Sequence, residues 1–195
     1  MKDIWFGDKR DLIKWSVLLH LADRINADRI VQIAYYRPGD FEEIDIDGER
    51  IEIRREVKSH FRDIRSIMRI GSSVKITVFD RPFEERRSYL EAAIEFIRKY
   101  SKERCVIFLD PDTGLQSKKP DFKHVLENEV RLIWGTLKEN EIFAFYQHQT
   151  NRSGEPWVEQ KREQLARALG VDMSSVKVAS AKGVISDVVL FYCQK

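Results

Sequence analysis

The sequence predicts an α/β fold of three layers, in which a mainly parallel sheet is covered by helices on both faces. Apolar, strand-like segments alternate with helical segments through the second half of the chain. Such alternation is typical of parallel strands joined by crossover helices. The last two strand-like segments are only about five residues apart, too few for a parallel crossover, so they should pair antiparallel. An Asp-Gly dipeptide between alternating residues predicts a β-hairpin insertion near 42–57.

The first part of the chain is predicted to form a helix over residues 8–25 and a strand over 30–36. Asp8 is a suitable N-cap, because its carboxylate can accept from the free N–H groups of the first turn. Apolar residues recur behind it at the spacing of an amphipathic helix. The strand is largely apolar, which is typical of burial on both faces, and Arg37-Pro38-Gly39 ends it.

The hairpin is predicted over EIDIDGERIEI, residues 43–53, where apolar and polar residues alternate on both sides of Asp47-Gly48. This dipeptide accepts the positive φ angles of a type I′ turn. Beyond the hairpin, helices and strands are predicted to alternate. In chain order they are a helix at 60–70, a strand at 74–80, a helix at 83–101, a strand at 105–110, a helix at 121–138, a strand at 141–147, a helix at 157–169, and strands at 176–181 and 187–193.

Composition and length favour one domain that spans residues 1–195. The chain is 43% hydrophobic, enough to fill one core. No apolar run approaches the roughly 18 residues that cross a bilayer. Charged residues interrupt the N-terminal segment where a signal peptide needs an apolar stretch. Cys105 and Cys193 lie in strand-like segments and form no metal-type cluster, so we expect a reduced, cytoplasmic protein without a membrane partner.

Polar residues follow three of the predicted strands at the point where each strand ends. They are Asp80, the pair Asp110 and Asp112, and Gln147-His148-Gln149. Ligands bind outside the carboxyl ends of parallel strands, near the reversal of strand order, so these residues are expected to form one site. Pro111 stiffens the backbone between two acids, and Gly114 permits a tight turn close to a ligand.

Asp110, Asp112 and His148 are the predicted catalytic residues. Histidine can act as a general base near neutral pH, bind a metal ion or donate a hydrogen bond to a substrate. Two carboxylates held on a stiff loop can orient a substrate or bind a divalent cation. The residue types therefore locate a site at the rim of the sheet and leave its reaction open.

Three features of the sequence carry a family resemblance: the order of elements in the second half, VIFLDPD at residues 106–112, and GDKRDLIKW at residues 7–15. Together they resemble the class I S-adenosylmethionine-dependent methyltransferases. VIFLDPD occupies the place where N6-adenine and related methyltransferases carry an Asp-Pro-Pro-aromatic motif, and GDKRDLIKW is similar to a helix of some rRNA adenine methyltransferases. Residues 106–116 and 146–148 also resemble an uncharacterised bacterial and phage-associated group with FLDPDNGLE followed by YQH.

This resemblance implies a Rossmann-like fold and a diverged methyltransferase-like enzyme that acts on a nucleotide or nucleic acid, with S-adenosylmethionine as its cofactor. Asp80 would then bind cofactor hydroxyls, Lys14 would lie near the cofactor carboxylate, and Asp110 would orient the acceptor. The sequence departs from the family pattern in two places. Asp112 stands where the family has its second proline, and no G-x-G spacing follows the first strand.

A metal-dependent phosphodiesterase or nuclease is an alternative interpretation. Asp110, Asp112 and His148 would then bind Mg²⁺ or Mn²⁺. A second arrangement has nuclease-like spacing across the hairpin, namely Asp45 or Asp47 with Glu56-Val57-Lys58.

Charge along the chain supports a third interpretation, a non-catalytic module that binds nucleic acid or protein. Residues 50–69 contain seven basic and three acidic residues, whereas residues 40–49 contain six acids and no base. The basic half could bind phosphates, or the two halves could pair with each other as a solvated hairpin. The net charge of +2 does not separate these cases, because only the distribution of charge matters.

Overall fold

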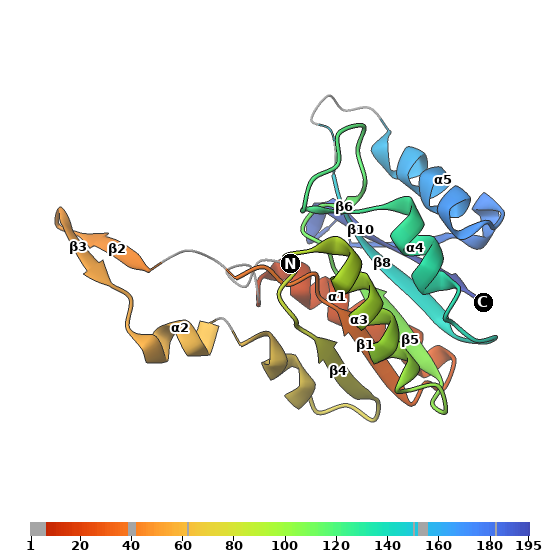
Figure 1. The fold of residues 1–195 in the computed structure, drawn as a ribbon, viewed down its shortest axis with the longest axis horizontal. Coiled ribbons are helices and arrows are strands. Elements are labelled where there is room, and N and C mark those ends of the chain that lie inside the picture. Colours follow the sequence, from red (N-terminus) through yellow and green to blue (C-terminus); the bar gives the residue numbers. More distant parts are fainter. Residues whose placement is uncertain (1–6, 39–41, 62, 150, 152–155, 182) are drawn as a thin grey trace.

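The computed structural model describes residues 7–38, 42–61, 63–149, 151, 156–181 and 183–195. Its centre is a six-stranded sheet in the order β4-β1-β5-β8-β10-β9 (Figure 1). These strands are β1 (Arg29–Ile33), β4 (Lys75–Phe79), β5 (Cys105–Leu109), β8 (Ile142–His148), β9 (Lys177–Ala181) and β10 (Ile185–Gln194). β4, β1, β5 and β8 are parallel, whereas β10 is antiparallel to β8 and β9. The predicted mainly parallel sheet with an antiparallel pair at its end is confirmed.

Helices cover both faces of the sheet, as predicted. One face packs against α1 (Lys9–Arg24) and the 3-10 helix η2 (Ile64–Arg69). The other face packs against α3 (Arg86–Arg98), α4 (Glu127–Trp134) and α5 (Trp157–Leu169). Within the described ranges, no helix is long and apolar enough to cross a membrane.

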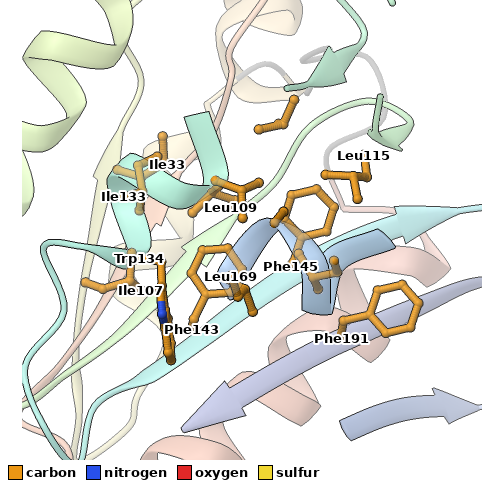
Figure 2. Close-up of a cluster of buried hydrophobic side chains, with 14 of the residues drawn as sticks. Ile33, Ile107, Leu109, Leu115, Ile133, Trp134, Phe143, Phe145, Leu169 and Phe191 are labelled. Atoms are coloured by element: carbon orange, nitrogen blue, oxygen red, sulfur yellow. The ribbon is translucent and has the colours of Figure 1, made fainter. Parts of the chain in front are cut away.

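The sheet separates two hydrophobic cores, because successive strand residues point to opposite faces. In β5, Val106 and Phe108 belong to the core beneath α1, whereas Ile107 and Leu109 belong to the core beneath α3, α4 and α5. Figure 2 shows part of that second core, in which the aromatic ring of Phe143 lies close to Trp134. Every residue of β5 is buried, so its uninterrupted apolar sequence reflects burial on both faces.

The first helix and strand are located as predicted, with a shorter strand. Asp8 is the N-cap of α1, and its carboxylate accepts from the backbone N–H groups of Arg10 and Asp11. β1 ends at Ile33, three residues earlier than the sequence predicts. Tyr35 takes a φ of 45°, a left-handed conformation that turns the chain out of the sheet.

Three elements beside the sheet carry the charged segment of the sequence: β2 (Glu43–Ile46), β3 (Glu49–Glu52) and α2 (Arg55–Phe61). Together with Glu42 they form an arm that extends away from the sheet (Figure 1). The predicted turn is confirmed, since Asp47 and Gly48 have φ angles of 56° and 86°. The hairpin is therefore an insertion between β1 and β4, as expected.

The helix predicted over 60–70 is wrong. α2 ends at Phe61, and η2 begins at Ile64. Ile64 and Ile67 are buried, whereas Met68 is exposed. Buried side chains three residues apart fit the three residues per turn of a 3-10 helix, so packing against the sheet favours η2 over a continued α-helix.

The helix predicted over 121–138 is also shorter than expected. Its first residues instead form β7 (His124–Val125), which pairs in parallel with β6 (Gly114–Leu115). The guanidinium of Arg86 donates to the carbonyls of Asp121 and His124 and holds this segment extended. The 3-10 helix η3 (Met173–Ser175) completes the described elements.

Candidate functional site

The strand order reverses between β1 and β5. From β1 the chain continues to β4 on one side, and from β4 it crosses to β5 on the other side. In open parallel sheets the crevice at the carboxyl ends of such strands is where ligands bind. Asp110 follows β5 directly, and its backbone N–H donates to the Ile33 carbonyl at the end of β1 over 3.0 Å. Asp110 therefore lies where the sequence predicts a site.

Side chains from two other elements hold the Asp110 carboxylate, which is 1% exposed. Lys14 Nζ from α1 lies 3.1 Å from Oδ1 and 3.0 Å from Oδ2, and Gln32 Nε2 from β1 donates to Oδ2 over 2.8 Å. Lys14 Nζ also lies 2.5 Å from Asp11 Oδ1. Asp11, Lys14 and Asp110 thus form a group that we call the buried ion cluster.

Burial and ion pairing shift the pKa values of Lys14 and Asp11 in opposite directions. Burial lowers the pKa of Lys14, but Asp110 and Asp11 outweigh this effect, and the net result is a raised pKa. Burial raises the pKa of Asp11, and Lys14 opposes that shift. Burying three ionisable groups contributes little to stability, because desolvation offsets their attraction. Their position at the ligand crevice makes the buried ion cluster a candidate functional site.

The buried ion cluster joins two predicted site residues, Lys14 and Asp110, to each other. The carboxylate of Asp110 is buried, so a ligand that approaches from solvent meets other groups first. The roles that the family resemblance implies for both residues, near a cofactor carboxylate and beside an acceptor, stay predictions.

Asp112 lies on the loop that follows Asp110 and has a cationic partner. Its carboxylate contacts the guanidinium of Arg37, which belongs to the turn after β1. The next residue, Thr113, donates to the Lys123 carbonyl from its backbone N–H over 3.1 Å and from its hydroxyl over 2.7 Å. Both acids of the Asp-Pro-Asp stretch are thus engaged with basic side chains from other segments.

Gln147 holds the loop in place from the end of β8. It is fully buried; its Oε1 accepts from the Leu115 backbone N–H over 2.9 Å, and its Nε2 donates to the carbonyls of Thr113 and His148. Gly114 lies against this amide with a φ of +119°, and a Cβ there would fall 2.4 Å from Gln147 Oε1. The glycine is required by a close approach of protein to protein, whereas the sequence suggested an approach to a ligand.

Lys161 of α5 supports the same segment from the other side. Its Nζ donates to the carbonyls of Leu115 and Gln116 over 3.1 and 2.8 Å, and to Gln164 Oε1 over 2.8 Å. Burial lowers the pKa of Lys161 from its ordinary 10.5 to about 8, although Glu127 opposes the shift.

Stability is therefore expected to depend on pH through Lys161. The folded protein releases this proton at about pH 8 and the unfolded chain near 10.5, so between these values the unfolded chain binds more protons. The contribution of Lys161 to the free energy of unfolding should then rise with pH across this window. Urea unfolding from pH 7 to pH 11 should show this rise in the wild type relative to Lys161→Met. Parallel curves for the two proteins would contradict the prediction.

His148 lies at the end of β8 on the exposed part of the rim. Its Nε2 is 3.2 Å from Oδ2 of Asp187, near the start of β10, and its Nδ1 is 3.0 Å from the Gln149 carbonyl oxygen. Arg10 of α1 donates from Nη2 to the same Asp187 oxygen over 2.5 Å. Each of these side chains is about one-third exposed. We call Arg10, His148 and Asp187 the rim triad.

Arg10, Asp11 and Asp187 belong to the candidate site and are not predicted from the sequence. The signal for Asp187 is its place near the start of an antiparallel last strand, because that start lies at the rim where the parallel strands end. The signal for Arg10 and Asp11 is the density of charge in the first turns of α1. Asp11 and Lys14 are three residues apart and therefore share one face of the helix.

Asp80 follows β4, as predicted, and pairs with neither the rim triad nor the buried ion cluster. Arg65 of η2 holds it, with Nε 2.5 Å from Oδ2 and Nη2 3.1 Å from Oδ1. Aromatic side chains fill the turn after β1. The Tyr35 ring centre lies 5.1 Å from those of Phe83 and Tyr89, and its backbone N–H donates to Tyr89 Oη. These residues do not fit the mode in which S-adenosylmethionine lies against a glycine-rich turn.

The predicted metal ligands are not assembled into a metal site. Among the residues that the structure describes, no group of three or more His, Cys, Asp or Glu side chains could hold a metal ion. Lys58 of the second nuclease-like arrangement pairs with Glu42 and Glu52 of the hairpin. The geometry therefore gives the metal-dependent interpretation no support.

No protein-family model matches the sequence, and no curated protein matches it. The chemistry of the site therefore has to be inferred from its own residues.

Proposed function

We propose that the protein is an enzyme with a methyltransferase-like sheet that acts on a nucleotide or nucleic acid at the rim triad. One observation carries the proposal: within the described residues, a buried donor and a buried acceptor of the triad, Arg10 Nε and Asp187 Oδ1, lack hydrogen-bond partners. Buried polar groups in proteins are nearly always paired. A ligand with both an acceptor and a donor would satisfy them, and a nucleotide presents both.

Tyr146 connects the rim triad to the buried ion cluster. Lys14 Nζ lies 5.1 Å from the centre of its ring. Burial raises the pKa of Tyr146, Asp110 and Asp187 raise it further, and Arg10 lowers it, so the ring senses charges of both groups. These neighbours support treating the rim triad and the buried ion cluster as parts of one site.

His148 is the group suited to move a proton in this site. Its two ring nitrogens face acceptors, the Gln149 carbonyl and the Asp187 carboxylate. The ring donates to both only when both nitrogens carry a proton, so loss of one proton breaks one contact. A substrate at Nε2 would replace Asp187 as the partner. Arg10 is suited to an anionic group such as a phosphate, because its guanidinium presents several donors in a fixed plane.

A non-catalytic module that binds nucleic acid is the second candidate. The observation that favours it is the exposure of Arg54 and Arg55, which make no ion pair among the described residues. Phosphate binding by such residues would be strongly dependent on salt. It would also be independent of the rim triad.

The proposal is tested by binding to the wild type and to His148→Gln and Asp187→Asn. The ligands are adenosine monophosphate, S-adenosylmethionine and a short single-stranded RNA, measured by calorimetry and by the shift of the thermal unfolding midpoint. Loss of a charge-assisted hydrogen bond should weaken nucleotide or RNA binding at least about tenfold. His124→Gln is the matched control, because His124 pairs with Asp121 outside the triad.

Two results would count against the proposal. One is the absence of binding by all three ligands, and the other is equal affinity in the wild type and both triad variants. RNA binding that disappears in Arg54→Glu/Arg55→Glu and persists in the triad variants would establish the second candidate instead.

A further inference from the structure

The hairpin of the arm has an apolar face that nothing in the described chain covers. Ile44 pairs with Ile51 across the two strands, and Ile46 lies two residues from Ile44, so the three side chains share one face. They are 47%, 41% and 49% exposed, in that order. Figure 1 shows the hairpin projecting away from the sheet. An isolated two-stranded hairpin is marginally stable in water, so the exposed isoleucine face indicates a surface that another molecule covers.

The charges of the hairpin restrict the kind of partner. Residues 42–52 contain six acids and one base. Such a surface repels the phosphates of a nucleic acid. The partner that fits is a protein surface with apolar side chains and basic residues around them.

This chain carries such a surface on α2 of the arm and on the adjoining η2, which together with Arg54 we call the basic stem. Residues 54–69 contain six basic and two acidic residues. Val57, Met68 and Ile70, in the stem or directly after it, are 39–43% exposed. The stem therefore combines apolar and basic groups in the way that the hairpin requires.

The stem of the same chain does not cover the hairpin. Lys58 pairs with Glu42 and Glu52 at the base of the hairpin, yet the isoleucine face stays exposed. Arg54 and Arg55 make no ion pair within the described residues. Both complementary surfaces of one chain are thus left open to a second chain.

We propose that two copies of this chain associate through their arms, with the acidic hairpin of each copy against the basic stem of the other. This arrangement has two-fold symmetry, so both contacts are equivalent and the assembly closes as a dimer. It leaves the rim triad outside the interface and is independent of the proposed function.

Charge reversal on each surface tests the proposal in the full-length chain. Glu43→Lys/Glu49→Lys changes the net charge of hairpin residues 42–52 from −5 to −1, and Arg54→Glu/Arg55→Glu changes that of stem residues 54–69 from +4 to zero. Sedimentation at low ionic strength should show the wild type as a species of twice the 23.0 kDa chain mass. Each charge variant should dimerise at least about tenfold more weakly, because most of the attraction between hairpin and stem is lost at both contacts. The wild-type dimer should weaken at about 1 M salt, where the Debye length is about 3 Å.

An equimolar mixture of the two charge variants is the decisive measurement. One contact of the mixed pair again joins a hairpin of net charge −5 to a stem of net charge +4, so the heterodimer should form more tightly than either variant associates with itself. Ile44→Ser/Ile46→Ser retains the charges and should dissociate the dimer without changing the circular dichroism of the fold. A monomeric wild type at low salt, or a mixture that stays monomeric, would overturn the proposal. RNA binding to a monomeric wild type through the stem would overturn it as well.

Discussion

Lys14→Met is expected to lower the free energy of unfolding by about 3–5 kcal/mol, the cost of removing one partner from a buried ion pair. The substitution leaves two carboxylates, Asp110 and Asp11, buried without their shared cation. Lys14 itself is 4% exposed, so water cannot replace the ammonium without rearrangement. Urea unfolding of the wild type and the variant measures the difference.

A double variant and a surface control sharpen this test. Lys14→Met/Asp110→Asn removes both charges of the pair, so its loss should be smaller than the sum of the two single losses by more than about 1 kcal/mol. Arg87→Ala breaks an exposed pair with Glu91 and should cost less than about 1 kcal/mol. A loss below about 1 kcal/mol for Lys14→Met would show that the buried ion cluster contributes no more than a surface pair.

Gly114→Ala is expected to lower the free energy of unfolding by about 3 kcal/mol through two effects. A φ of +119° is unfavourable for any residue with a Cβ, which costs about 1–2 kcal/mol. The new Cβ would also meet the amide of Gln147, which makes two hydrogen bonds to the loop and one to the His148 carbonyl. Displacing that buried amide leaves polar groups unpaired, at about 1–3 kcal/mol.

Gly170→Ala is the matched control for Gly114→Ala. Gly170 ends α5 with a φ of +71°, and no atom lies within 4 Å of the position that a Cβ would take. Its substitution should therefore cost only the backbone term, about 1–2 kcal/mol. Equal losses of unfolding free energy at the two positions would show that the contact with Gln147 does not destabilise Gly114→Ala.

Much of the fold can be predicted from the sequence because its signals are local. The Asp-Gly turn at 47–48, the Asp8 cap of α1 and the antiparallel last pair each follow from neighbouring residues or from the length of a connection. The extents of elements are less predictable where packing decides them. η2 and β7 both lie where the sequence predicts helix. Packing of Ile64 and Ile67 against the sheet favours η2, and hydrogen bonds from Arg86 to backbone carbonyls hold the segment of β7 extended. Both causes are tertiary contacts, which the local sequence does not reveal.

The location of the candidate site can be predicted from the sequence, whereas the residues that form it can be predicted only in part. The place of Asp110 and His148 at the rim can be predicted, because both follow or end strands that the sequence reveals. Gln147 belongs to the fold through its bonds to residues 113, 115 and 148, although its position next to His148 resembles that of a site residue. Asp187 joins the site only because β10 runs antiparallel and begins at the rim.

The sequence by itself determined the succession of the six sheet strands along the chain, the turn of the hairpin and the acids at the end of β5. Only the tertiary structure decided that Lys14 pairs with Asp110, and that His148 and Arg10 meet at Asp187. Local propensities act over a few residues. These pairs join residues far apart in the chain, and buried charges select partners only after the sheet has brought its strand ends together.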